Sequence, residues 1–533
     1  MNYRFTFLIV ALVGLYALLG FHLYQVSVLK GDYYLAKAEA QALASQGVNG
    51  DRGAIYFTDN QGNTLPAALE QPFPVIYAVP SAIADAQEAA NTVAPILNIP
   101  VPTLLGIFSR KNDQYELLVR KADPSVAQQI TDLNLKGVYA DFEPERFYPL
   151  GPVASQLLGY VGPNASNTGD GGHYGIEEYY NSVLGKGLSS DVSLTIDPNV
   201  QIEAEKVLDD LIKANNATGG SVVVEDPVTG KILAMGSYPN FDPNDYASSS
   251  IASFMNPVTQ KVYEPGSIFK VLTMAAGIDA GKLTPTTTYT DYGHLTINGR
   301  YLQNYDYLTH GAYGPGTTMT QVIEHSINTG AVYAEGLIGN STFTDYLKQF
   351  GLDEKTGIDL PGEADGNLSQ LAPKAPQVAF ATAAYGQGVA VTPLELVNAV
   401  SAIANGGLLM RPYVNAARAP EVIRRVIATS SAAQVAQMMV DAVDLAGVAN
   451  IDGYSLAGKT GSAFIPDLVH GGYTDKLIDS YIGFGPTSRP RFVAFVKLDG
   501  LPSDAIAALS VVPAFRNLSQ YLINYYNIPP DRL

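Results

Sequence analysis

A long run without charged residues lies close to the start of this chain and constrains every later inference about its fold. Residues 5–29, FTFLIVALVGLYALLGFHLYQVSVL, contain no Asp, Glu, Lys or Arg. A helix rises about 1.5 Å per residue, so roughly 20 apolar residues cross the hydrocarbon core of a bilayer. We therefore expect residues 5–29 to form a transmembrane anchor.

The ends of this run favour an anchor over a cleaved signal peptide. Its C-terminal part carries the bulky residues His22, Tyr24 and Gln25 where a cleavage site needs small ones. Arg4 precedes the run, and the positive-inside tendency then places residues 1–4 in the cytoplasm. We expect a single-pass protein of the cell membrane with a short cytoplasmic N-terminus and a large extracytoplasmic part after Lys30.

Length and charge restrict the rest of the chain. The protein has 533 residues, of which 47% are hydrophobic and 15% are charged, so it can bury two or more folded cores. Its net charge of −18 repels phosphate backbones, and the sequence contains no basic run. We do not expect nucleic acid as a partner.

Cysteine and histidine usage restricts the chemistry. The chain has no cysteine, which excludes disulfides, thiolate metal sites and cysteine nucleophiles. Its six histidines show no metal-ligand spacing such as HExxH. We expect a mechanism without a metal or other cofactor.

The pattern along the chain changes near Asp191. Before it, residues 30–190 contain short strands and turns such as DNQGN and PNASNTGDGG, without obvious chemistry. After it, DVSLTIDPNVQIEAEKVLDDLIKA indicates a strand followed by an amphipathic helix. We predict one extracytoplasmic domain over residues 30–190 and a second over residues 191–533.

The second domain is predicted to hold one sheet assembled from distant segments. GGSVVVEDPVTGKILAMGSYP indicates a hairpin turning at residues 226–230, and strands return at DSYIGFGP and RFVAFVKLDG. Long helical stretches fill residues 267–440, and the C-terminal stretch is helical with an expected kink at Pro513. This order favours an α+β domain in which terminal helices back the sheet and an all-helical lobe faces it.

The segment YEPGSIFKVLTMAAGID raises the first chemical question. Ser267 is either a helix-capping serine or a nucleophile activated by Lys270, because positions i and i+3 of a helix lie about 5–6 Å apart at Cβ. Burial would lower the pKa of the Lys270 amine and let it accept the serine proton. The pattern alone is weak, since Ser27 and Lys30 also match it at the membrane.

Two further short motifs follow. Ser326-Ile327-Asn328 is equally consistent with a polar helix end. Lys459-Thr460-Gly461 has three interpretations: part of a P-loop from Gly453 to Thr460, a decoy for the second copy at residues 355–357, or a segment of strand whose backbone could line a cleft. A P-loop requires a strand before it and a helix after it, and the flanking residues predict neither.

Together and in this chain order, the three motifs resemble the signature set of penicillin-binding proteins and serine β-lactamases. The flanks YEPGSIFK, AAYGQGVAVTPLELVNAVSAIANGG and LAGKTGSA look like class B penicillin-binding proteins, the membrane-anchored transpeptidases of peptidoglycan synthesis. The likeness continues upstream through ERFYPLGPVASQLLGYVG, GIEEYYNSVLGKG and LTIDPNVQ, and so covers nearly the whole chain. In that family KTGIDLPGE recurs as a non-catalytic segment.

The resemblance implies a fold and a role for each site residue. It implies a penicillin-binding/β-lactamase-like transpeptidase domain, with an antiparallel sheet, flanking helices and an all-helical lobe, at residues 191–533. A mixed α/β pedestal domain of the dimerisation type would occupy residues 30–190. The implied catalytic residues are Ser267 as nucleophile, Lys270 as base, Ser326 as proton relay, and Asn328 as ligand of Lys270 and of the donor. Lys459, Thr460, Gly461 and Ser462 would line the donor-carboxylate site, and the N–H groups of Ser267 and Ser462 would form the oxyanion hole.

The same resemblance implies the substrates and partners. The donor would be a peptidoglycan stem peptide ending in D-Ala-D-Ala, β-lactams would acylate the serine, and a membrane glycosyltransferase would be a partner. Two positions depart from the family pattern, the acidic turn in RGAIYFTDNQG and Ser462 where threonine is usual. A serine β-lactamase, a β-lactam sensor and a catalytically weak scaffold remain alternatives.

Overall fold

The computed structural model describes residues 52–164, 170–185, 190–467 and 469–532, together with Leu12, Tyr16 and Leu19. The chain forms two compact units, one built from residues 1–55, 66–150 and 182–191 and the other from residues 56–65, 151–181 and 192–533. The chain passes between these units more than once, and the single boundary at Asp191 stays a prediction.

The first unit is a mixed α/β domain built on one long strand. Strand β2 (Thr64–Ala78) pairs antiparallel with β3 (Glu116–Val119) and with β4 (Val138–Phe147). Helices α3 (Ala86–Leu97), α4 (Val101–Phe108) and α5 (Pro124–Asp132) enclose a small core with these strands. Its buried members include Ile76, Val93, Phe108 and Ile130.

The second unit contains a five-stranded antiparallel sheet whose strands come from both ends of the domain. Its order is β16 (Ala457–Pro466), β17 (Tyr473–Gly485), β18 (Phe492–Pro502), β8 (Gly219–Asp226) and β9 (Lys231–Tyr238). The hairpin expected at residues 226–230 joins β8 to β9. The predicted single sheet of sequence-distant strands is confirmed, with β16 at its edge.

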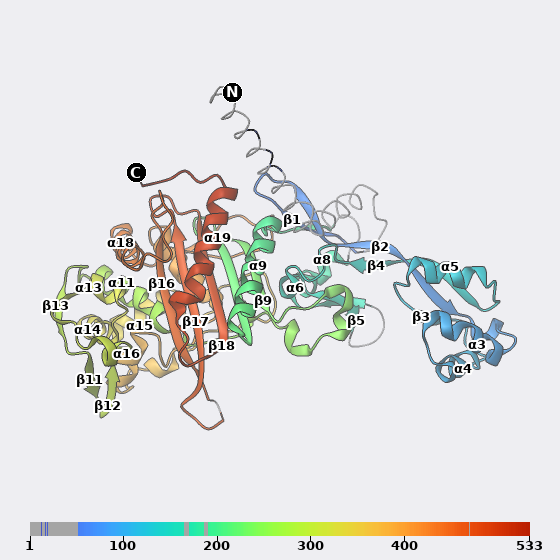
Figure 1. The fold of residues 1–533 in the computed structure, drawn as a ribbon, viewed down its shortest axis with the longest axis horizontal. Coiled ribbons are helices and arrows are strands. Elements are labelled where there is room, and N and C mark those ends of the chain that lie inside the picture. The colour runs from blue at the N-terminus through green and yellow to red at the C-terminus, as the bar shows by residue number, and fades with distance from the viewer. Residues whose placement is uncertain are drawn as a thin grey trace, which may run out of the picture. The chain divides into compact units, whose positions relative to one another are not determined.

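Two terminal helices cover one face of this sheet, as Figure 1 shows for α9 (Pro198–Asn215) and α19 (Val511–Tyr525). Helix α9 begins where Asp197 accepts hydrogen bonds from the N–H groups of Asn199 and Val200. Leu208, Val222, Val496 and Phe515 belong to the core between helices and sheet. These apolar contacts hold the strands that carry the site.

Helix α19 corrects one expectation. Pro513 lies in the first turn of the helix, which begins at Val511, and not at a kink within it. A proline is tolerated there because the first N–H groups of a helix have no intrahelical acceptor.

The opposite face of the sheet is covered by α17 (Pro393–Ala404), which contacts β8, β17 and β18 and is buried along nearly its whole length. Helix α18 (Thr429–Ala446) contacts β16 and borders a second, mainly helical lobe. The expectation of an all-helical lobe is wrong, because short strands within residues 288–318 pack against two of its helices. That lobe contains α11 (Phe269–Asp279), α13 (Met319–Glu324), α14 (Asn328–Ile338), α15 (Asn340–Gln349) and α16 (Gln377–Ala383), seen beside the β16 edge in Figure 1.

Shorter elements complete the chain. The strands are β1 (Ile55–Thr58), β5 (Tyr160–Pro163), β6 (Asp170–His173), β7 (Val192–Ser193), β10 (Thr288–Asp291), β11 (His294–Ile297), β12 (Arg300–Gln303), β13 (Gly314–Thr318), β14 (Leu408–Met410) and β15 (Val422–Arg425). The helices are α6 (Ser155–Leu158), α7 (Gly175–Tyr179), α8 (Asn181–Leu184), α10 (Pro257–Gln260) and α12 (Tyr307–His310). Single 3-10 turns include η5 (Gly266–Ile268) and η7 (Ala507–Leu509).

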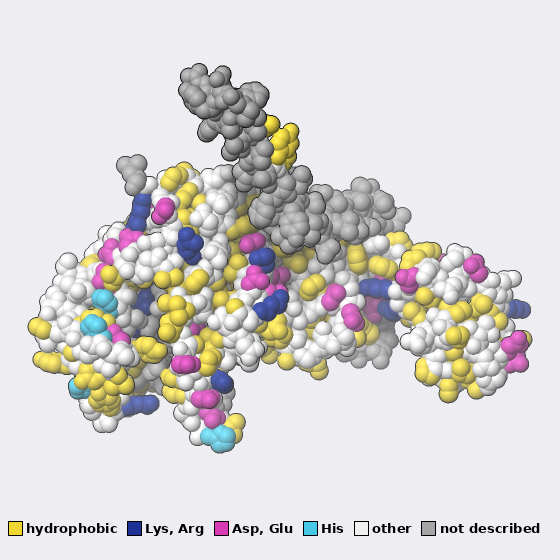
Figure 2. All heavy atoms as spheres, in the orientation of Figure 1, with side chains coloured by type: hydrophobic (Ala, Val, Ile, Leu, Met, Phe, Trp, Pro, Cys, Tyr) yellow, Lys and Arg dark blue, Asp and Glu magenta, His cyan; other side chains and the backbone are white. Residues whose placement is uncertain are grey.

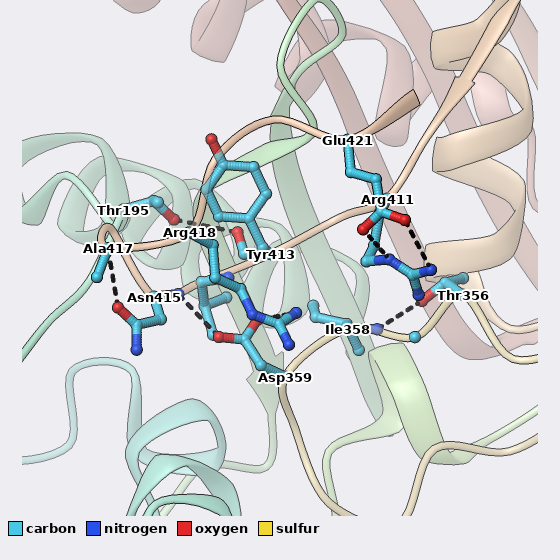
Figure 3. A network of polar contacts seen from close by, with 12 residues as sticks. Thr195, Thr356, Ile358, Asp359, Arg411, Tyr413, Asn415, Ala417, Arg418 and Glu421 are labelled. Atoms are coloured by element: carbon cyan, nitrogen blue, oxygen red, sulfur yellow. Dashed lines mark hydrogen bonds and ion pairs between the residues drawn. The ribbon is translucent and has the colours of Figure 1, made fainter. Parts of the chain in front are cut away.

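A buried carboxylate ties three segments of the second unit together (Figure 3). Asp359 is fully buried and accepts the N–H groups of Val414 and Asn415 at 2.8 and 3.0 Å. It also accepts the hydroxyl of Tyr180 at 2.7 Å. Because each acceptor oxygen has a donor, this charge stabilises the loop instead of straining it.

The predicted anchor at residues 5–29 and the tail at residues 1–4 lie outside the described residues, apart from Leu12, Tyr16 and Leu19. The Ser27 copy of the first motif lies outside them too. Within the part of the chain that the structure describes, no helix combines the length and the apolar character that a membrane crossing requires. On the face shown in Figure 2, the Lys and Arg side chains of the described residues are scattered rather than gathered.

Candidate active site

Ser267 lies where a 3-10 turn runs into a buried helix. It belongs to η5, and α11 begins two residues later at Phe269. Neither η5 nor α11 has a side-chain cap, so the capping interpretation of Ser267 is wrong. The Nζ of Lys270 donates a hydrogen bond to the Oγ of Ser267 at 2.9 Å, as the spacing of the motif predicts.

Burial sets the charge of Lys270. The side chain is fully buried in the first turn of α11. Burial holds the pKa of its amine well below the ordinary value, the nearby Lys459 lowers it further, and Asp306 opposes the shift. A lowered pKa favours the neutral form of a lysine amine, which can accept a proton from the hydroxyl that it contacts.

Ser326 joins this pair to a second lysine. It lies in the turn between α13 and α14, and its Oγ is 3.0 Å from the Nζ of Lys270 and 3.0 Å from the Nζ of Lys459. Its carbonyl oxygen also accepts a hydrogen bond from Lys270. The backbone at Ser326 has a φ of 56°, a left-handed conformation that non-glycine residues adopt at an energetic cost. The turn therefore holds one hydroxyl between two amines.

Lys459 reaches the site from the edge strand β16. The side chain is 4% exposed, and burial lowers the pKa of its amine to about 7. Its Nζ also lies 3.2 Å from the Oγ1 of Thr460. A strand rather than a helix contains Lys459 and Thr460, so the P-loop interpretation is wrong and the strand interpretation is confirmed.

Two glycines allow η5 to approach β16. A Cβ on Gly266, whose φ is 56°, would lie 2.5 Å from the carbonyl oxygen of Ser462. A Cβ on Gly461 would lie 2.6 Å from the carbonyl oxygen of Pro265. Both distances are far below van der Waals contact, so only glycine lets the nucleophile turn lie against this strand.

Asn328 occupies the first position of α14 and makes a different contact from the one that the resemblance implied. Its Nδ2 donates to the carbonyl oxygen of Gln303 at 2.9 Å, and among the described residues it makes no hydrogen bond to Lys270. This bond fixes the start of α14 to the end of β12. Asn328 is half-buried, and its amide oxygen has no bond within the part of the chain that the structure describes.

Sequence reasoning missed Asp479 on β17. Ser462 faces Asp479 across the β16–β17 pair, and its Oγ donates to the Oδ1 of Asp479 at 2.6 Å. The signal was the strand register, because directly opposed residues of an antiparallel pair share a face. That register is not readable from the two strand sequences alone.

The second copy of the lysine motif lies elsewhere. Lys355 is exposed in the loop after α15, and Thr356 is buried and bonds to Glu363 through its N–H and its hydroxyl. Figure 3 shows Thr356 in this loop, beside Ile358 and Arg411. The expectation that this copy is a loop segment is confirmed.

Comparison with known families agrees with this geometry. The family described as penicillin binding protein transpeptidase domain matches residues 220–520, which include all three motifs. This chain belongs to the class B penicillin-binding proteins. The penicillin-binding protein dimerisation domain matches residues 48–216. As a member of this family the protein is a serine transpeptidase that β-lactams acylate.

Individual relatives of this penicillin-binding protein span most of its length. Stage V sporulation protein D of Bacillus subtilis is 31% identical over 490 residues, which is 84% of this chain and 74% of that protein. Peptidoglycan D,D-transpeptidase FtsI of Escherichia coli K12 is 27% identical over 540 residues, 95% of this chain and 89% of the relative. The crystal structure of a peptidoglycan synthetase from Bifidobacterium adolescentis has a TM-score of 0.65 at 26% identity and covers 90% of this chain and 96% of that one.

A structure of penicillin-binding protein 3 from Mycobacterium tuberculosis, complexed with aztreonam, has a TM-score of 0.67 at 23% identity. It covers 90% of this chain and 97% of that chain. This likeness supports the fold, a transpeptidase domain preceded by a dimerisation domain of mixed helices and sheets.

Proposed function

We propose that this protein is a membrane-anchored peptidoglycan D,D-transpeptidase in which Ser267 is the nucleophile and Lys270 its general base. The observation that carries the proposal is the 2.9 Å contact between the Ser267 hydroxyl and the buried amine of Lys270. Burial disfavours the charged form of this amine, so it can serve as the base that takes the serine proton.

Acylation begins when the Ser267 Oγ attacks the carbonyl carbon between the two D-alanines of a donor stem peptide. Lys270 takes the hydroxyl proton as the C–O bond forms. The tetrahedral intermediate collapses, the C–N bond breaks, and the leaving amine of the terminal D-alanine needs a proton. Ser326 supplies that proton and regains one from Lys459 or Lys270, because its Oγ lies 3.0 Å from both amines.

The donor is held from the β16 side. Lys459 and the hydroxyl of Thr460 bind the terminal carboxylate, because a cation and a hydroxyl 3.2 Å apart form a compact anion site. Ser462 and Gly461 form the strand surface along which the donor lies. The N–H groups of Ser267 and Ser462 bind the oxyanion, a device in which the loss of one donor typically costs about 2.7–4 kcal/mol.

The second half-reaction resolves the acyl-enzyme. An amine of a neighbouring stem peptide attacks the ester carbon and its proton passes to Lys270. The new amide bond forms the crosslink as the ester C–O bond breaks, and Lys270 returns the proton to the Ser267 oxygen. Asn328 contributes its amide oxygen, which is not bonded within the described residues, to the donor backbone. The proposed role of Asn328 is therefore substrate binding, without the contact to Lys270.

The proposed location of the protein is the cell membrane. The uncharged run at residues 5–29 anchors the protein in the membrane, with residues 1–4 in the cytoplasm. Residues 30–190 form the pedestal and residues 191–533 the transpeptidase domain. Similarity to peptidoglycan D,D-transpeptidase FtsI supports a location at the cell membrane, and a glycosyltransferase in the same membrane would supply the glycan strands that carry the stem peptides.

A serine β-lactamase would use the same constellation to hydrolyse penicillin. The match of residues 48–216 to the dimerisation domain favours the transpeptidase, because a compact hydrolase needs no such domain.

The test uses the purified full chain in detergent with a lipid-linked glycan polymer and a partner polymerase. Mass spectrometry of the digested product should show crosslinked stem-peptide dimers and free D-alanine with the wild type and neither with Ser267→Ala. Crosslinks formed by Ser267→Ala would overturn the nucleophile assignment. Rapid release of hydrolysed penicillin without crosslinks would indicate the β-lactamase instead.

A further inference from the structure

A buried carboxylate lies directly behind the proposed donor site and takes no part in the mechanism above. Asp479 on β17 is fully buried, while Ser462, the residue opposite it on β16, is exposed. The Ser462 Oγ donates to the Asp479 Oδ1 at 2.6 Å. A buried acidic group thus contacts the hydroxyl of an exposed residue on the edge strand.

The surroundings of Asp479 are unusual for a buried carboxylate. Its second oxygen lies 3.5 Å from the hydroxyl of the buried Ser510, and no ion pair joins it to a cation among the described residues. Burial raises the pKa of Asp479, and the hydrogen bonds from Ser462 and Ser510 oppose this shift. Such a group is costly to bury for packing alone, so its contact with Ser462 calls for a function.

The hydroxyl of Ser462 has one proton and therefore one donor direction. While that proton points at Asp479, the Ser462 oxygen offers only lone pairs to a ligand. While Asp479 itself donates, the Ser462 proton is free to point at an anion. In either case the position of the Ser462 oxygen is fixed by its partner on β17.

We propose that Asp479 is a positioning residue for the donor-carboxylate site and acts through the Ser462 hydroxyl. It holds the Ser462 side chain in one rotamer on the edge strand, so that the hydroxyl lies beside the anion site formed by Lys459 and Thr460. This inference rests on the proposed function, because the carboxylate that it serves is that of the donor or of a penicillin.

The edge position of β16 makes this positioning necessary. One side of the strand pairs with β17, the other faces η5, and Ser462 itself is exposed. An unrestrained serine samples three rotamers. A contact of 2.6 Å to a fixed carboxylate selects one of them before the substrate arrives.

The test is a double-mutant cycle on the full chain, read as the second-order rate constant for acylation of Ser267 by a fluorescent penicillin, which carries the carboxylate. Asp479→Ala should slow acylation about tenfold, as expected for a lost hydrogen bond to a charged group. In the Ser462→Ala background the same change should alter the rate by less than about twofold, because the hydroxyl it positions is gone. Asp479→Asn, which keeps the shape and a hydrogen bond, should stay within about threefold of the wild type.

Equal losses from Asp479→Ala in both backgrounds would overturn the inference, since Asp479 would then act without Ser462. Asp479→Asn as slow as Asp479→Ala would overturn it too, because position without charge would not suffice. Asp475→Asn removes an exposed carboxylate from the same strand and should leave the rate unchanged. If Asp479→Ala fails to fold, Asp479→Leu, which also removes the acceptor but fills more of the space, takes its place in the cycle against Ser462→Ala.

The result separates this inference from the proposed function. If the wild type is not labelled at Ser267, the proposed function fails and the cycle cannot be measured. If the wild type is labelled and the cycle is additive, the function stands and the role of Asp479 falls.

Discussion

The same three letters, Lys-Thr-Gly, occur twice in this chain in opposite environments. In the copy on β16, Lys459 is buried, has a pKa of about 7 and contacts the hydroxyl of Ser326 at 3.0 Å. In the loop copy, Lys355 is exposed and Thr356 is bonded to Glu363. The comparison teaches that the chemistry of a short motif is set by the backbone that carries it and by burial, not by its letters.

The largest expected effect comes from removing Lys270, the proposed base. Lys270→Ala should slow acylation of Ser267 by about 10²–10⁴, the usual contribution of a general base. Rapid-quench labelling with fluorescent penicillin measures the rate. The circular dichroism spectrum and melting temperature of the variant provide the control for folding. A rate within tenfold of the wild type would show that Ser267 is activated by another group.

A matched pair of substitutions tests which of the two Lys-Thr-Gly copies takes part in acylation. Lys459→Ala should slow acylation about 10–100-fold, because the penicillin carboxylate loses its cation and Ser326 loses one of its two amine partners. Lys355→Ala should change the same rate less than about twofold, since this side chain is exposed in a loop. A larger loss from Lys355→Ala than from Lys459→Ala would reverse the assignment of the two copies.

The pH profile of acylation gives a further test of Lys459. Below the lowered pKa of Lys270 the amine is protonated and the base is lost, so the rate falls on the acid side. Above about pH 7 the Lys459 amine loses its proton and no longer attracts a carboxylate, so the rate falls on the alkaline side. Lys459→Arg keeps the charge, and we expect it to remove the alkaline limb while the acid limb stays. An unchanged alkaline limb would assign that limb to another group.

The smallest effect concerns the threonines of the two copies. Thr356→Val should lower the free energy of unfolding by about 1–3 kcal/mol, because a buried oxygen of Glu363 loses its hydroxyl donor. Acylation should stay within about twofold. Thr460→Val should do the reverse, slowing acylation with little change in stability. Urea denaturation measures the stability of the two variants, and penicillin labelling measures their acylation rates. Equal stability losses in Thr356→Val and Thr460→Val would contradict the different roles of the two threonines.

The parts of the fold that local patterns specify were predictable. The β8–β9 hairpin follows from its turn residues, and α9 follows from Asp197, Pro198 and the apolar spacing behind them. The Ser267–Lys270 contact follows from helix geometry. Only the family resemblance predicted that Lys270, Lys459 and Ser326 lie close together, because no local pattern predicts contacts between segments that are distant in the chain.

The features that were missed depend on tertiary register. Asp479 lies opposite Ser462 because β16 and β17 pair in one particular register. That register depends on where the loop between the two strands begins and ends, and the sequence pattern does not fix these positions. Asn328 binds Gln303 because α14 begins against β12. The kink expected at Pro513 was wrong because the start of α19 was placed too early in the sequence.

The central claim is that one hydroxyl, that of Ser267, is activated by Lys270, although Ser326 contacts the same amine. Peptide mapping by mass spectrometry after brief exposure to penicillin tests it most directly. The account predicts a single adduct on the peptide that carries Ser267. An adduct on the peptide that carries Ser326, with Ser267 unmodified, would contradict it.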